Sequence, residues 1–206
     1  MGTITQTITR RIRAKKRGWV FTPKDFLDIG SRASVDQALS RLVKQNIIRR
    51  LDRGIYDFPK KHSSLGLLSP SVNDLAKAVA AQTGDIIFPS GAVSANYLSL
   101  STQVPARPVF MTNGTSRIKK IAGRHVKLQH ARIPITAKIS DKANFVLQAL
   151  YYLGKNSIDD DVILKCAKHL NQKDFKNMSS VLSRIPGWMT DIILRMQKLK
   201  YGLVRM

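Results

Sequence analysis

The stretch SVDQALSRLVKQNIIRRLDRGIYDF, residues 34–58, decides the fold of the amino-terminal part of the chain. Ser34 and Gln37 have the spacing of a capping box, so the sequence predicts a helix over 34–45. After this helix, two β-rich runs flank the glycine-containing turn 52–54, which predicts a hairpin. The buried face of the helix is an apolar stripe at helical spacing, made of Val35, Ala38, Leu39, Leu42 and Val43.

The same stretch carries polar and basic side chains at positions that this pattern leaves exposed. Residues at i, i+4 and i+7 share one face of a helix, and long polar side chains on such a face reach base edges and phosphates. The exposed residues are Gln37, Ser40, Arg41 and Lys44 on the helix, and Arg49, Arg50 and Arg53 on the hairpin.

The preceding residues complete an order of helix, short strand, helix, helix and basic hairpin. Isoleucines at positions 4, 8 and 12 predict a basic helix over 3–16, and residues 19–21 indicate an extended segment. Thr22-Pro23-Lys24-Asp25 is a strong helix start, because it offers a cap, a proline at the first position and a capping-box acid. This order is typical of a winged helix-turn-helix, with helix 34–45 in a major groove and the hairpin on flanking phosphate. The alternative is that these charges only solvate a small helical domain.

Charge and composition narrow the partner classes. The chain has 35 Lys and Arg residues against 13 acidic ones, a formal net charge of +22, and residues 1–61 carry 15 against 5. All the acidic residues are Asp, which excludes HExxH zinc proteases and paired-Glu glycosidases. The single Cys166 excludes a disulfide framework, and no apolar run reaches the ~18 residues of a membrane span. We therefore expect a cytoplasmic protein whose main partner is a polyanion.

Three parts of an α+β fold are predicted along the chain. Residues 1–61 would form the winged helix-turn-helix, and a linker over 59–70 would lead to a mixed α/β domain over 62–140. In that domain Asn113-Gly114 has the signature of a two-residue hairpin turn. Residues 141–206 have helical spacing throughout and would form the helical carboxyl-terminal part. The basic residues of the middle domain concentrate on its predicted strands, at Arg117, Lys119, Lys120, Arg124 and Lys127.

Three motifs allow a catalytic or metal-binding alternative. Residues 89–91, Pro-Ser-Gly, resemble part of a phosphate loop, but with one Gly and no following Lys they favour a structural turn. The acids at 159–161 could suggest a magnesium site, yet acids at a helix start complement the helix dipole, which is the favoured interpretation. Cys166 lies on an apolar helix face and is expected to be a buried thiol. We expect no enzymatic activity, no metal and no cofactor.

Two segments resemble AbiEi-family antitoxins. The sequence RGIYDFP at 53–59 is similar to the end of the winged helix of that family. The sequence PSGA at 89–92, followed by ANYLSLSTQVP at 95–105, is similar to a segment of its antitoxin domain. The resemblance covers residues 5–140 well and the helical remainder loosely.

The resemblance implies two activities. One is repression of the chain's own operon through inverted repeats in double-stranded operator DNA. The other is to counteract, directly or indirectly, a nucleotidyltransferase-like toxin of a type IV toxin-antitoxin, or abortive infection, system. A plain repressor without a toxin partner and an RNA-binding protein are the alternatives. The basic middle strands would supply the surface of the RNA-binding protein; in an antitoxin they would suit an acidic protein partner or the nucleic acid on which the toxin acts. By position in the motif, the implied DNA contacts are Arg32, Gln37, Ser40, Arg41, Lys44, Arg49, Arg50 and Arg53.

Overall fold

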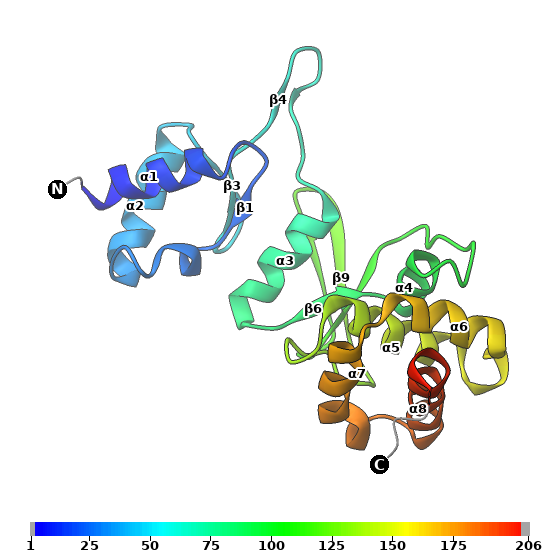
Figure 1. The fold of residues 1–206 in the computed structure, drawn as a ribbon. Coiled ribbons are helices and arrows are strands. Elements are labelled where there is room, and N and C mark those ends of the chain that lie inside the picture. The colour runs from blue at the N-terminus through cyan, green and yellow to red at the C-terminus, as the bar shows by residue number, and fades with distance from the viewer. Residues whose placement is uncertain (1–2, 203–206) are drawn as a thin grey trace. The chain divides into compact units, whose positions relative to one another are not determined.

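The computed structural model describes residues 3–202. The outer bounds of the predicted domains, residues 1 and 206, lie outside the described residues. The described residues form eight α-helices and three sheets. Figure 1 shows this mixed α/β architecture. The predicted combination of helices and strands is therefore confirmed. The chain folds as two compact units, of which the first extends across the expected boundary at 61 and the second across the expected boundary at 140. The units are Met1–Asp85 with Arg117–Lys127, and Ile86–Ser116 with Leu128–Met206.

The first unit begins with two helices that pack on a small antiparallel sheet. The strand order in this sheet is β1-β3-β2, so the last of its strands in sequence lies in the middle. Cross-strand pairs include Phe21 with Tyr56 and Arg49 with Asp57. Buried apolar side chains from both helices and the sheet form one core. The elements are α1 (Ile4–Ala14), β1 (Val20–Phe21), the 3-10 helix η1 (Pro23–Phe26), α2 (Arg32–Lys44), β2 (Arg49–Asp52) and β3 (Ile55–Asp57).

Local sequence signals account for the start of this unit. Ile8 and Ile12, from the predicted stripe on α1, are completely buried. The helix start predicted at Thr22 forms only the single turn η1, in which Asp25 accepts a hydrogen bond from the Thr22 backbone at 2.8 Å. The rings on either side of this turn, Phe21 and Phe26, meet edge to face at 5.5 Å between centroids, as a hydrophobic staple requires.

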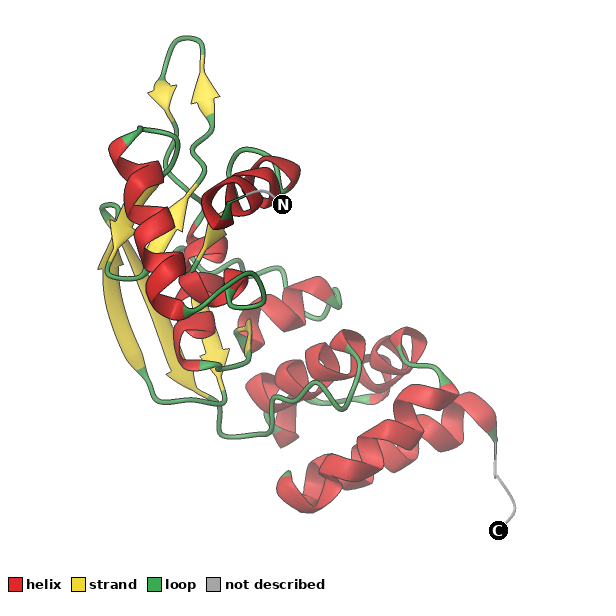
Figure 2. Ribbon diagram, turned by 90° about the vertical axis from the view of Figure 1, so that its left-hand side faces the viewer, coloured by secondary structure: helices red, strands yellow, loops and turns green. Residues whose placement is uncertain are grey.

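The segment expected to be a linker is a small two-stranded arm. Its strands β4 (Lys61–His62) and β5 (Gly66–Leu67) pair antiparallel, and Figure 2 shows them as a projecting hairpin. Gly66 has a φ of +68°, a left-handed conformation that suits glycine at the end of the turn. The arm is exposed along its length, including Leu65 and Leu67. The linker prediction missed this hairpin because its strands are only two residues long.

The first unit also contains helix α3 (Val72–Thr83) and residues of a four-stranded sheet. One hairpin turn predicted in this sheet is wrong. The strand order of that sheet is β6-β7-β9-β8, so β7 pairs with β9 rather than with β8. Asn113-Gly114 therefore connects two strands that are not neighbours. The tight turn is instead Ala122-Gly123, where both residues have positive φ, +48° and +76°, as a type I′ turn requires. The strands are β6 (Ile87–Pro89), β7 (Val109–Thr112), β8 (Arg117–Ile121) and β9 (Arg124–His130).

The second unit has its own core, formed mainly by the predicted carboxyl-terminal helices. Ala95 of α4 (Gly91–Tyr97), Leu98 at the C-cap of this helix and Ile133 of the loop after β9 join this core. The acidic run at 159–161 begins a helix as predicted, with the Asp159 carboxylate accepting from the Val162 backbone at 2.9 Å. The helical elements are α4 (Gly91–Tyr97), α5 (Asp141–Leu153), η2 (Lys155–Ser157), α6 (Asp160–His169), α7 (Gln172–Met178), η3 (Ser179–Arg184) and α8 (Gly187–Tyr201).

The thiol of Cys166 is buried in that core, as its position on an apolar face predicted. Burial raises the pKa of the thiol to about 12, because an apolar environment disfavours the thiolate. Among residues 3–202, no helix is both long enough and apolar enough to cross a membrane.

Candidate nucleic-acid interface

Helix α2 begins earlier than the sequence pattern predicted. Its N-cap is Ser31, whose hydroxyl accepts from the Ser34 backbone at 3.3 Å, and Arg32 is the first helical residue. The predicted Ser34–Gln37 capping box is therefore wrong. An ion pair between Arg32 Nε and Asp36 Oδ2, 2.8 Å long and four residues apart, supports the additional turn. Gln37 is not used for capping, and its side chain is exposed.

The two faces of α2 differ as the spacing predicted. Val35, Ala38, Leu39 and Leu42 are between 0% and 2% exposed and pack into the core of the first unit. The opposite face is exposed at each of the polar positions singled out from the sequence, which are Gln37, Ser40, Arg41 and Lys44. The fold therefore fixes the helix through its apolar side and leaves one side free for a partner.

The dimensions of this exposed face suit a duplex. From Arg32 to Lys44 the helix rises about 18 Å, at 1.5 Å per residue. A major groove is about 12 Å wide, so the middle of the face faces base edges when its two ends lie over the phosphates. If α2 lay in a major groove, Gln37 and Arg41 would face the base edges and Lys44 a flanking phosphate, whereas Arg32, nine residues and about 180° around the helix from Arg41, would lie outside this face.

The hairpin β2–β3 presents only part of its predicted basic tip. Arg49 forms a bidentate ion pair with the buried Asp57 carboxylate, at 3.0 Å and 2.6 Å, and also donates to the Leu68 carbonyl at 2.7 Å. This pairing raises the pKa of the Arg49 guanidinium and holds its side chain within the unit. Arg50 and Arg53 are exposed. Of the three predicted contacts on the hairpin, these two are the ones free to reach a ligand.

The five basic residues of the predicted middle strands also divide into two groups. Arg117 pairs with Asp85 at 2.7 Å and donates to the Thr83 hydroxyl at 2.9 Å, so it joins β8 to the end of α3. Lys119 lies 3.1 Å from the Gln82 side-chain oxygen and 3.9 Å from Asp52. The remaining three side chains are exposed, and they are Lys120, Arg124 and Lys127.

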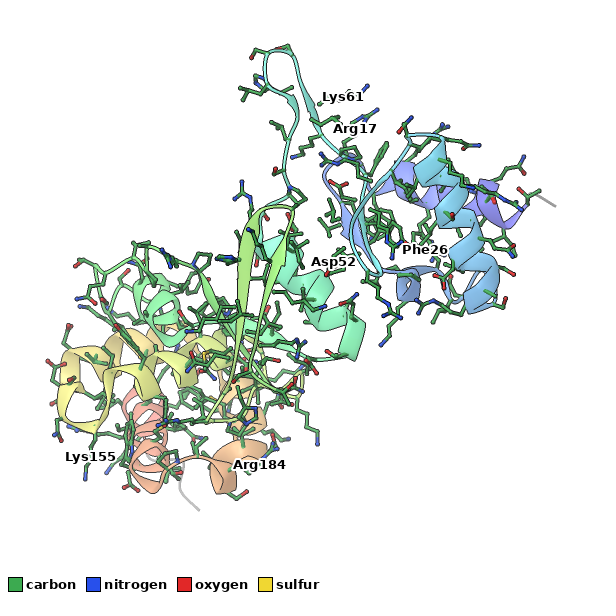
Figure 3. All side chains as sticks on the ribbon, turned by 180° about the vertical axis from the view of Figure 1, so that it is seen from behind. Arg17, Phe26, Asp52, Lys61, Lys155 and Arg184 are labelled. Atoms are coloured by element: carbon green, nitrogen blue, oxygen red, sulfur yellow. The ribbon has the colours of Figure 1, made fainter. Side chains whose placement is uncertain are left out.

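The sequence patterns missed two groups of basic residues near this interface. Lys24 lies on η1, the turn that precedes α2, and its position inside a helix-start motif concealed it. Arg17 and Lys61 flank the base of the arm, as Figure 3 shows. Arg17 stacks 4.7 Å above the Phe58 ring and donates to the Pro59 carbonyl at 3.0 Å. The run of basic residues before Gly18 was the available signal for Arg17.

Comparison with known proteins adds a family assignment to this geometry. Residues 7–178 match the model of a family of unknown function, DUF6088. The chain belongs to this family. Among solved structures, the crystal structure of the RV2827C protein from Mycobacterium tuberculosis is similar with a TM-score of 0.46 and 14% identity, covering 98% of this chain and 78% of that one. A search of curated proteins gave no match.

Proposed function

We propose that this DUF6088 protein binds double-stranded operator DNA sequence-specifically and represses transcription. In this proposal the first unit acts as a winged helix-turn-helix, with α2 as the recognition helix and the β2–β3 hairpin as the wing. The observation that carries the proposal is the division of α2 into an apolar face, buried at Val35, Ala38, Leu39 and Leu42 and half-buried at Val43, and an exposed face of Gln, Ser, Arg and Lys. Arginine and glutamine are residue types that pair bidentately with guanine and adenine in the major groove.

The charge of the molecule supports a polyanionic partner. A net charge of +22 attracts nucleic acid over a long range and gives binding that weakens as salt screens the phosphates. Positive charge alone would attract RNA as well as DNA. The helical reading face favours duplex DNA, because the major groove of an RNA helix is too deep and narrow for side chains to read.

DNA binding is tested with the full-length chain and the DNA upstream of its own gene. Titration of this DNA and of a scrambled duplex of equal length and composition should give a preference for the first, with roughly 10³-fold or greater discrimination at physiological salt for a specific site. The logarithm of affinity should fall linearly with the logarithm of salt concentration for both duplexes. Equal affinity for the two duplexes, or tighter binding to single-stranded RNA of that sequence, would refute the proposal.

The resemblance to AbiEi-family antitoxins supports a second activity, which is to counteract a nucleotidyltransferase-like toxin. The similar segment, residues 89–105, belongs to the second unit, where it forms the end of β6, helix α4 and the loop that follows. Helix α4 is anchored in the core by Ala95 and Leu98, while Tyr97 and Val104 are 54% and 76% exposed. Exposed apolar side chains at the end of α4 and in the loop that follows it offer a surface for a protein partner.

Point variants of the full-length chain separate the two activities. Arg41→Ala should abolish repression of a reporter yet still protect cells that express the neighbouring toxin gene, since Arg41 lies in the first unit. Loss of protection together with loss of repression would show that the toxin is controlled only through transcription. A neighbouring gene that encodes no nucleotidyltransferase-like protein would favour the plain repressor.

A further inference from the structure

A cleft with a volume of about 330 Å³ lies in the first unit, and its charged lining residues are all basic. This volume lies within the range of small-ligand sites, roughly 300–1,000 Å³. The remaining lining residues are neutral, and no carboxylate is among them. The eight residues are the basic Lys24, Arg32, Arg53 and Lys119 with the neutral Thr22, Pro23, Gly54 and Gln82.

The four cations come from four different elements. Lys24 belongs to η1, Arg32 begins α2, Arg53 lies in the turn between β2 and β3, and Lys119 lies on β8. The side chains of Lys24 and Arg53 make no ion pair with any residue of the described range 3–202. Arg32 pairs with Asp36 and Lys119 lies 3.9 Å from Asp52, so the charge without a carboxylate partner in the cleft is that of Lys24 and Arg53. An anion that enters the cleft would neutralise this charge.

One side chain fixes two walls of the cleft. Gln82, on α3, donates from Nε2 to the Arg53 carbonyl oxygen at 2.7 Å, and its Oε1 accepts from Lys119 Nζ at 3.1 Å. Asp52, labelled at this hairpin in Figure 3, lies 3.9 Å from the same lysine. The turn of the wing and the lysine of β8 are thus held in place before a ligand arrives, which lowers the entropic cost of binding.

We propose that this cleft binds phosphate groups of the DNA backbone at the amino-terminal end of α2, and that Lys119 therefore belongs to the DNA-binding surface. The inference rests on the proposed function and extends its contact surface beyond residues 1–61. Arg32 connects the two, because it lines the cleft and is the first residue of α2, the proposed recognition helix. Arginine forks and lysine ammonium groups are the usual ligands of phosphate oxygens.

The test measures the salt dependence of duplex binding by the full-length chain. Each lost phosphate contact reduces the steepness of the log–log salt slope by about 0.9 and, at 0.1 M salt, lowers affinity about eightfold. We expect this change for Lys119→Gln and for Lys24→Gln, whereas Lys119→Arg should keep the wild-type slope. Lys77→Gln is the matched control, since Lys77 is an exposed lysine of α3 that does not line the cleft. It should leave the slope unchanged.

The outcomes distinguish this inference from the proposed function. If Lys119→Gln and Lys24→Gln keep the wild-type slope while Arg41→Ala loses sequence discrimination, the chain binds DNA but the cleft is not part of the interface. Equal losses for Lys77→Gln and Lys119→Gln would also overturn the inference, because any lysine would then suffice. Absence of duplex binding by the wild-type chain would overturn the proposed function itself. Thermal unfolding of each variant shows whether a loss of binding reflects a loss of fold.

Discussion

Substitution of Gly91 by alanine should destabilise the second unit, because no space exists there for a β-carbon. Gly91 is the first residue of α4, and this helix packs closely on α5. A β-carbon at position 91 would lie 2.7 Å from the Gln148 backbone oxygen and would also overlap the Tyr152 β-carbon. Neither obstacle is the flexible end of a side chain, so the two helices would have to separate.

The expected magnitude follows from two opposing terms. Overpacking of a well-packed core costs about 1–3 kcal/mol, and a rigid backbone obstacle places this site in the upper part of that range. Alanine recovers up to about 1 kcal/mol through its better helix propensity. The net loss is about 2 kcal/mol, which lowers the melting temperature of a chain of this length by roughly 4–8 °C.

Differential scanning calorimetry of Gly91→Ala beside Gly187→Ala measures this effect against a matched control. Gly187 is also the first residue of a helix, α8, but a β-carbon there would meet nothing within 4 Å. Its alanine variant should be neutral or up to about 1 kcal/mol more stable. An unchanged melting temperature for Gly91→Ala would refute the packing argument.

Three further predictions concern single contacts. Asp57→Asn should lower the free energy of unfolding by about 2–3 kcal/mol, because Arg49 would lose its charged partner within the unit; urea denaturation measures this loss. Ser31→Ala should lower the free energy of unfolding by about 1 kcal/mol and Ser34→Ala by distinctly less, because Ser31 is the N-cap of α2. A larger loss for Ser34→Ala in the same urea denaturation would instead support the Ser34–Gln37 capping box that the sequence predicted. The thiol of Cys166 should resist alkylation at pH 8 in the folded chain and react after denaturation, because burial raises its pKa to about 12; rapid labelling of the folded chain would contradict the buried position.

The parts of the fold that follow from neighbouring residues were predictable. The isoleucine stripe of α1, the apolar face of α2 and the Asp159 cap each depend on residues within one or two helical turns. The start of α2 was mispredicted for the same local reason. Ser31 and Ser34 lie three residues apart and both are good caps, so the pattern alone did not choose between them.

The parts that depend on contacts between distant residues were not predictable. Asn113-Gly114 has the composition of a hairpin turn, but strand pairing places β9 rather than β8 beside β7. Arg49 was expected at the surface, yet the register of β2 and β3 sets it opposite Asp57. The residues of the candidate interface also fall into a predictable and an unpredictable group. The exposed face of α2 follows from periodicity, whereas the position of Lys119 beside Gln82 depends on the packing of α3 against β8.

Competition binding of Arg41→Ala and Arg53→Ala tests most directly whether α2 reads sequence. At fixed salt, each variant is titrated with the preferred duplex and with a scrambled one. Arg41→Ala should lose roughly 1–3 kcal/mol of binding free energy on the preferred duplex only, because in this account the Arg41 side chain reads a base. Arg53→Ala should weaken both complexes about equally, because it contacts phosphate. Equal losses on both duplexes for Arg41→Ala would contradict the account, since α2 would then bind the DNA backbone without reading its sequence.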